Sequence, residues 1–192
     1  DWEVWLPPGV QPPEDLVVVP LTGMVTATIQ PVLQRINSDQ VLTGPIEIDA
    51  PAGLKWKGGI FLGPFRLQED AYGSWTLIEK VPLERYLQGV VPHEIGLGSS
   101  LVALSTQTVL ARTWALANKH RFVVDGYHLC SDTQCQVYRD PSRSNELVLE
   151  AIKNTSGKVL TWNNKPINAF YHASNGGIMA SNEEAWDTKV LP

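Results

Sequence analysis

The sequence has no apolar run long enough to cross a bilayer and no excess of positive charge. A transmembrane helix needs about 18 or more consecutive apolar residues, and no stretch reaches that length. The 20 acidic residues outnumber the 15 basic ones and give a net charge of -5. This balance disfavours a general nucleic-acid-binding surface. The sequence also lacks a phosphate-binding P-loop, a dinucleotide-binding fingerprint and an HExxH zinc motif, which argues against those classes of enzyme.

Cysteine is scarce as well. The only two, Cys130 and Cys135, lie five positions apart in the run HLCSDTQC. In an oxidising compartment they could pair, and in a reducing one they could bind a metal with His128 or His120. A structural zinc site usually takes four protein ligands, so two thiols and one histidine are too few. We favour a disulfide or free thiols over a metal site, by about two to one.

The 192 residues, 43% of them hydrophobic, predict one sizeable globular domain of the α+β class. Four prolines fall within residues 1–15, which we interpret as an extended leader outside the core. Residues 16–192 are assigned to a single domain, β-rich over 16–80 and helical over 81–192, where the candidate site lies. The chain begins without a basic, apolar signal segment. We therefore expect a mature or trimmed chain whose export signal was removed, and a C-terminal end that was cut as well.

Short apolar runs bounded by Gly and Pro predict antiparallel strands at 16–19, 24–29, 46–48, 60–62 and 74–78. Further along the chain, a two-residue turn at Asn163-Asn164 predicts a hairpin over 158–172.

Three helices are expected in the second half. The first runs from Leu83 to Val91, because Pro82 suits a helix start and Pro92 should end it. The second starts at Ser99 or Ser100, extends to 118–120, and is apolar around most of its circumference, which is typical of a buried central helix. The third covers 144–155.

Glu94 is the main candidate for chemistry. We expect it in a Gly-rich turn just before the buried helix, exposed to a ligand but partly dehydrated. Dehydration raises the pKa of a carboxyl group, and a carboxyl that keeps its proton near neutral pH can act as a general acid. The plainer interpretation is a surface acid, which is common.

Two further features contain polar groups in unusual settings. Arg112 lies inside the apolar helix, where its guanidinium must be paired or reach a ligand, and we give both alternatives equal weight. A predicted strand runs into a Gly-Gly turn and presents hydroxyl, imidazole and amide groups together, although it could be only a polar turn. Its residues are Tyr171, His172, Ala173, Ser174, Asn175, Gly176 and Gly177.

Over about residues 55–192 the chain resembles the SpoIID/LytB family. The resemblance is carried, in the family's order and roughly its spacing, by the runs VPLERYLQGVVPHE, ALSTQTVLARTWAL, CSDTQCQVY, NTSGKVLTWNNKPINAFYHASNGG and EEAWD. It implies a lytic transglycosylase that cleaves the bond between N-acetylmuramic acid and N-acetylglucosamine in denuded peptidoglycan strands. Glu94 would be the catalytic acid. The implied substrate-binding residues are Arg112, Thr155, Tyr171, His172, Ser174, Asn175, Gly176 and Gly177.

The resemblance further implies export to the cell envelope or periplasm, with glycan strands as substrate and a cell-wall amidase as a candidate partner. No cofactor is required. Gln134 stands where sporulation members have His, and Ala173 where they have Ser. Zinc therefore remains a weak alternative, with Cys130, Cys135 and His128 as candidate ligands.

Two other readings stay open. The same residues could form a non-catalytic glycan-binding module that stimulates an amidase. Less favoured is a metal-dependent protein built on the Cys130–Cys135 loop.

Overall fold

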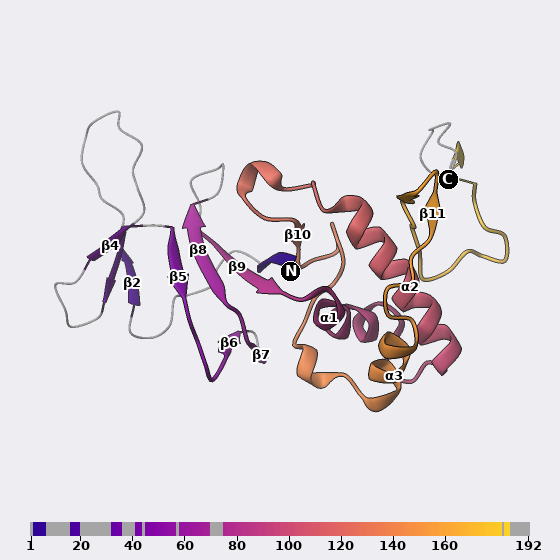
Figure 1. Ribbon diagram of the computed structural model, residues 1–192, viewed down its shortest axis with the longest axis horizontal. Helices are drawn as coiled ribbons and strands as arrows, with labels where there is room; N and C mark the ends of the chain where they lie inside the picture. Colours follow the sequence, from indigo (N-terminus) through magenta and orange to yellow (C-terminus); the bar gives the residue numbers. More distant parts are fainter. Residues whose placement is uncertain are drawn as a thin grey trace.

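Most of the strands lie at one end of the fold and the helices at the other (Figure 1). The computed structural model describes residues 2–6, 16–19, 32–35, 41–43, 45–56, 58–69, 75–181 and 183–184, with side chains from residue 45 onward. The predicted α+β class is confirmed. No helix in these ranges is long and apolar enough to cross a membrane.

The main sheet has five strands in the order β10-β1-β9-β8-β5. Its pairings are antiparallel except for the parallel pair β1–β10. The strands are β1 (Trp2–Leu6), β5 (Ile46–Ile48), β8 (Phe65–Glu69), β9 (Trp75–Val81) and β10 (Leu129–Cys130). On β9, Thr76 to Glu79 are all buried, so this central strand contributes to the core from both faces.

Two smaller sheets complete the β-rich part. One contains β2 (Leu16–Val19), β3 (Val32–Arg35) and β4 (Val41–Thr43), and the other contains β6 (Leu54–Trp56) and β7 (Gly59–Phe61). The strands expected at 16–19, 46–48, 60–62 and 74–78 are confirmed to within a few residues. The strand expected at 24–29 lies outside the described residues.

The expectation of a leader outside the core needs correction for residues 2–6. These residues form β1, which pairs with β9 in register from Trp2 opposite Val81 to Leu6 opposite Leu77. The run WEVWL is rich in the aromatic and β-branched residues that favour strands. The four prolines come after it, so none interrupts the ladder. Residues 7–15 lie outside the described ranges.

The helices are α1 (Leu83–Ile95), α2 (Leu101–Asn118) and α3 (Glu146–Asn154), with short 3-10 turns η1 (Val123–Asp125) and η2 (Pro141–Arg143). Ser100 caps α2 by accepting the amide of Ala103, and Asn145 caps α3 by accepting that of Val148. As expected, α2 is central and packs against both α1 and α3. The predicted hairpin is confirmed but short, with strands β11 (Thr161–Trp162) and β12 (Lys165–Pro166).

The prediction that α1 ends at Pro92 is wrong. The helix continues to Ile95 and includes Pro92. Proline has no amide proton, so the carbonyl of Gln88, four residues earlier, loses its usual helical donor. The hydroxyl of Ser144 donates to this carbonyl at 2.5 Å. This outside donor compensates for the missing bond, which accounts for the survival of the helix across a proline.

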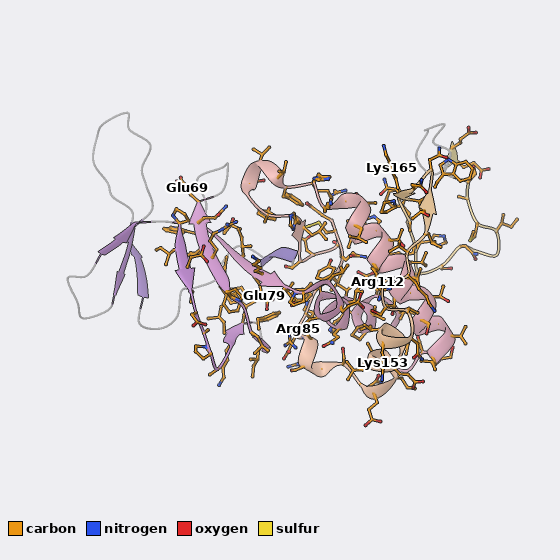
Figure 2. All side chains as sticks on the ribbon, viewed as in Figure 1. Glu69, Glu79, Arg85, Arg112, Lys153 and Lys165 are labelled. Carbon is orange, nitrogen blue, oxygen red and sulfur yellow. A yellow bond between two sulfur atoms is a disulfide. The ribbon has the colours of Figure 1, made fainter. Side chains whose placement is uncertain are left out.

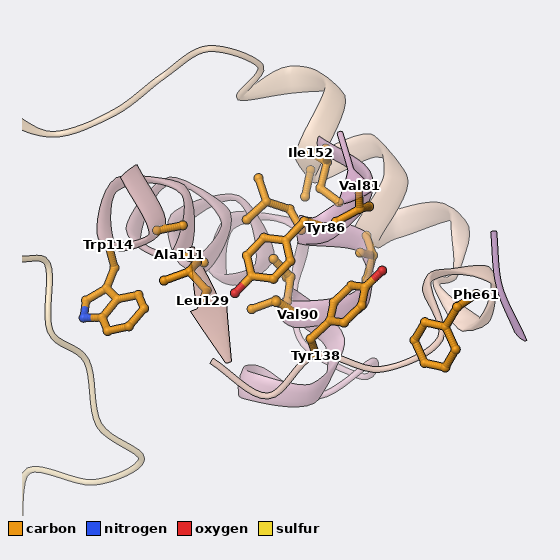
Figure 3. Close-up of a cluster of buried hydrophobic side chains, with 14 of the residues drawn as sticks. Phe61, Val81, Tyr86, Val90, Ala111, Trp114, Leu129, Tyr138 and Ile152 are labelled. Atoms are coloured by element: carbon orange, nitrogen blue, oxygen red, sulfur yellow. The ribbon is translucent and has the colours of Figure 1, made fainter. Parts of the chain in front are cut away.

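The core lies where the sheet meets the helices (Figure 3). Tyr86 on α1 stacks on Tyr138, with ring centroids 5.3 Å apart, and Phe61 of β7 packs against the other side of Tyr138. Other contributors come from β9, α2, β10 and α3, including Val81, Leu104, Ala111, Leu129, Val148 and Ile152.

Candidate functional site

Glu94 lies in the last turn of α1, not in the Gly-rich turn that the sequence predicts. Its side chain is half-buried. One carboxylate oxygen, Oε1, accepts the backbone amide of Val137 at 2.8 Å. Burial raises the pKa of Glu94 above its ordinary value, and the hydrogen bond from Val137 opposes that rise without cancelling it. The expected partial dehydration is therefore present.

A close approach between α1 and the segment 137–139 presents the Val137 amide to Glu94. A Cβ atom on Gly89 would overlap the carbonyl oxygen of Arg139 and the ring of Tyr138. Only glycine allows this contact. The amide of Arg139 also donates to the carbonyl of Gly89 at 3.0 Å. The segment is thus fixed against the helix one turn before the acid.

Gln136, adjacent to Val137, is buried and links Tyr86 of α1 to Tyr171. The Tyr86 hydroxyl donates to Gln136 Oε1 at 2.9 Å, and Gln136 Nε2 donates to the Tyr171 hydroxyl at 3.0 Å. Burial, and then the charge of Glu94, raises the pKa of Tyr171 well above its usual range. The phenol therefore stays neutral near the acid, as a hydrogen-bonding group.

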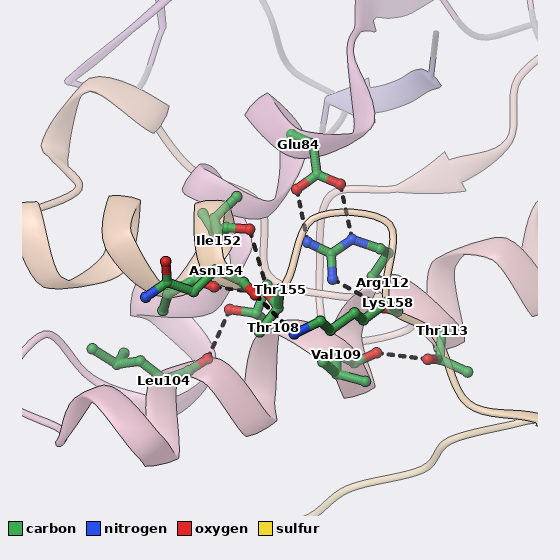
Figure 4. A network of polar contacts seen from close by, with 11 residues as sticks. Glu84, Leu104, Thr108, Val109, Arg112, Thr113, Ile152, Asn154, Thr155 and Lys158 are labelled. Carbon is green, nitrogen blue, oxygen red and sulfur yellow. Dashed lines mark hydrogen bonds and ion pairs between the residues drawn. The ribbon is translucent and has the colours of Figure 1, made fainter.

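Arg112 is buried and bonded to other parts of the fold (Figure 4). Its side chain is 1% exposed, and its Nε and one terminal nitrogen form a two-pronged ion pair with Glu84 at 2.9 and 2.7 Å. Another nitrogen donates to the carbonyl of Lys158 at 3.1 Å. Of the two alternatives considered for Arg112, the structure contains the ion pair. The predicted substrate contact is corrected, because the guanidinium is enclosed and already paired.

Thr155 is also corrected from a substrate-binding residue to a structural one. It is buried at the C-terminal end of α3, where its hydroxyl donates to the carbonyl of Ala151 at 2.7 Å. The same carbonyl also accepts the backbone amide of Thr155 at 3.2 Å, so the hydroxyl adds a second hydrogen bond at the end of the helix. This side chain has no exposed polar group to offer a ligand.

The turn after Tyr171 is exposed and held by its own local hydrogen bonds. The ring nitrogen Nδ1 of His172 lies 2.9 Å from the carbonyl of Ser174, and Asn175 accepts the amide of Gly177 at 2.9 Å. Gly176 and Gly177 have φ values of 62° and 104°, which favour glycine. The polar groups are thus presented to solvent. Among the described residues of this turn, only Tyr171 at its base bonds to Gln136, the neighbour of the Val137 amide that contacts Glu94.

Cys130 and Cys135 form a disulfide, which confirms pairing over free thiols. A zinc ion requires deprotonated, unbonded thiolates, and Gln134 offers no imidazole. Within the described ranges, no three His, Cys, Asp or Glu residues gather where they could hold a metal ion. The residues present therefore do not fit the zinc site that the weaker reading required.

A second carboxylate, that of Glu79 on β9, is buried and has a structural role (Figure 2). It accepts the amides of Leu62 and Gly63 and the hydroxyl of Tyr138. Burial raises its pKa, although these three hydrogen bonds act against the rise. Glu79 thereby anchors Tyr138, and with it the segment that presents the Val137 amide to Glu94.

Sequence reasoning missed Gln136 and the Val137 amide. Both lie in the run CSDTQCQVY, but nothing in that run marks a buried amide or a backbone donor. The contacts depend on residues 25 to 50 positions away. The available signal was weaker: a polar Gln between Cys135 and two residues suited to a core, Val137 and Tyr138.

Comparison with known proteins supports a family assignment. The family model for the stage II sporulation protein, SpoIID, matches residues 71–162, a segment that contains Glu94 and Gln136 and ends before Tyr171. The chain is 39% identical over 104 residues to a Bacillus subtilis (strain 168) protein named amidase enhancer, covering 54% of this chain and 14% of the relative. It is 35% identical over 132 residues to stage II sporulation protein D of Bacillus amyloliquefaciens, covering 60% of this chain and 38% of the relative.

The chain thus spans well under half of these relatives' length. A protein of Brachyspira hyodysenteriae with no assigned function is 28% identical over 144 residues, covering 72% of this chain and 36% of its own. Residues 71–162 of the chain are therefore similar to the SpoIID family.

Proposed function

We propose that this chain is a lytic transglycosylase that cuts peptidoglycan glycan strands, with Glu94 as its acid and then its base. The observation that carries the proposal is the setting of Glu94, a half-buried carboxyl with a raised pKa in a segment that matches the SpoIID family. A carboxyl of this kind retains its proton to a higher pH than an exposed one.

The chemistry begins with proton donation. Glu94 gives its proton to the glycosidic oxygen between N-acetylmuramic acid and N-acetylglucosamine, and the C1–O bond breaks. The muramic C1 gains oxocarbenium character. The Glu94 carboxylate then takes the proton of the muramic C6 hydroxyl, whose oxygen attacks C1 and closes a 1,6-anhydro ring. The leaving sugar keeps the first proton, and no water is consumed.

One carboxylate suffices because the nucleophile belongs to the substrate. Glycosidases that use water or a covalent intermediate generally need a second carboxylate within about 5–10 Å of the first. Within the described ranges, no second acid contributes to the pKa shift of Glu94. The Val137 amide stabilises the carboxylate formed after the first proton transfer.

The test is digestion of glycan strands stripped of stem peptides, with mass spectrometry of the soluble products. Wild type should release fragments with 1,6-anhydromuramic ends, and Glu94→Gln should release none. Glu150→Gln is a matched control, because Glu150 is an exposed glutamate on the surface of α3. Equal yields from wild type and Glu94→Gln would reject the assignment.

A second candidate function is supported by the similarity to the protein named amidase enhancer. In this reading the chain binds glycan without cleaving it and stimulates a separate cell-wall amidase. Wild-type protein would then be retained on purified sacculi without generating new sugar ends. The same retention accompanied by anhydro ends would favour the enzyme.

Either function places the working chain in the cell envelope, where peptidoglycan lies. The proposal includes residues 16–192 as one domain and invokes no cofactor. It also retains the exposed turn from His172 to Gly177 as a substrate contact, because its polar groups face solvent.

A further inference from the structure

Gln136 is a buried primary amide whose side-chain hydrogen bonds go to other segments of the described chain. Its side chain is 1% exposed. Oε1 accepts the Tyr86 hydroxyl, while Nε2 donates to the carbonyl of Ala111 at 3.2 Å and to the Tyr171 hydroxyl at 3.0 Å. The amide therefore joins α1, α2 and the segment that contains Tyr171.

The orientation of this amide is fixed by chemistry. A backbone carbonyl oxygen can only accept hydrogen bonds, so the Gln136 atom that faces Ala111 must be the nitrogen. The other amide atom, facing Tyr86, is then the carbonyl oxygen, and the Tyr86 hydroxyl must donate to it. A flipped amide would bring two oxygens together at Ala111. The direction of every bond in this group follows.

The consequence falls on Tyr171. One Nε2 hydrogen goes to Ala111 and the other to the Tyr171 oxygen, so this phenol is an acceptor at Gln136. Its own proton must point elsewhere. Among the described residues, no acceptor within hydrogen-bond distance receives that proton. The hydroxyl is only partly buried and close enough for the charge of Glu94 to act on it.

We propose, on the basis of the function proposed above, that Gln136 is a positioning residue. It holds the Tyr171 hydroxyl as a hydrogen-bond donor to a sugar oxygen beside the one that Glu94 protonates. The residue after it, Val137, directs its amide at Glu94. Two adjacent residues thus orient both polar groups, one through a side chain and one through the backbone.

The test measures binding of a stem-peptide-free glycan oligosaccharide in the Glu94→Gln background, by calorimetry. In this background the test does not depend on catalysis. Tyr171→Phe should weaken binding about tenfold, the value of one good hydrogen bond. Gln136→Met, which preserves length but donates nothing, should weaken it by a similar factor.

The double variant Gln136→Met/Tyr171→Phe separates positioning from general support. If Gln136 acts through Tyr171, the double variant should bind about tenfold more weakly than the parent, no worse than either single change. A loss of about a hundredfold, the product of two independent effects, would overturn the proposal.

Thr108→Val is the matched control. It removes another buried hydroxyl, one that donates to the carbonyl of Leu104 within α2 at 2.7 Å, and should leave glycan affinity unchanged. Should Gln136→Met fail to fold, Tyr171→Phe still decides whether the phenol donates to glycan, and unchanged affinity would overturn the inference.

The outcome is independent of whether the chain is an enzyme. If wild type and Glu94→Gln cleave glycan equally, the proposed function fails and this binding test still stands. If Glu94→Gln is inactive but Tyr171→Phe binds glycan normally, the proposed function survives and the role of Gln136 is rejected.

Discussion

Removing the exposed partner of the Arg112–Glu84 ion pair should destabilise the fold more than removing the buried one, because the buried guanidinium is then left without a counter-ion. Arg112→Met removes a donor from the carbonyl of Lys158, at a cost of about 1–3 kcal/mol. It also leaves Glu84 unpaired, but that side chain is 39% exposed and can be hydrated. We expect a total loss of about 2–3 kcal/mol, which lowers Tm by about 4–12 °C in a chain of this size.

Removing the acid should cost more. Glu84→Leu leaves a guanidinium that is 1% exposed without its counter-ion, and such changes typically cost about 3–5 kcal/mol. Urea unfolding of both variants measures which of them loses more free energy of unfolding. Calorimetry with stem-peptide-free glycan tests the structural role of Arg112, because the folded Arg112→Met variant should bind glycan like wild type. The reasoning would be refuted if Arg112→Met were less stable than Glu84→Leu, or if Arg112→Met lost affinity for glycan.

Three further results follow from the site and its supports. Because burial raises the pKa of Glu94, the folded state binds that proton more tightly than the unfolded state, and stability falls as pH rises from about 4.5 through the raised value. Glu94→Gln should therefore have a higher Tm than wild type at about pH 7 and lose that advantage at about pH 4, in thermal scans at both pH values. Ser144→Ala leaves the carbonyl of Gln88 without its donor and should cost about 1–2 kcal/mol in urea unfolding, whereas an unchanged midpoint would remove this support. Reduction of the Cys130–Cys135 bond opens a short loop and should lower the free energy of unfolding by about 2 kcal/mol. Urea unfolding curves with and without reductant measure this loss, and coinciding curves would contradict it.

Local chemistry in the sequence was enough to predict the helix starts. Ser100 is a good N-cap residue and accepts a backbone amide where the start of α2 was expected. Asn145, another good N-cap residue, does the same for α3 within two residues of its predicted start. The apolar character of α2 likewise predicted its central position. These features depend on neighbours within a few residues, so one sequence contains most of the necessary information.

Long-range contacts decided the rest. Pro92 predicts a helix end by every local rule, and only a hydroxyl 56 positions from the affected carbonyl allows α1 to continue. The even odds on Arg112 could not be resolved without knowing that Glu84 lies beside it, 28 positions earlier. Gln136 gave no local sign of its role, because its partners converge only in the folded chain.

The most direct measurement of the central claim is digestion of denuded glycan in water enriched in ¹⁸O, followed by mass spectrometry of the new muramic ends. If Glu94 takes the proton of the substrate's own C6 hydroxyl and that oxygen attacks C1, wild type should yield anhydro ends without ¹⁸O. Glu94→Gln should then yield no cleavage. Reducing ends labelled with ¹⁸O, or equal cleavage by the variant, would contradict the claim.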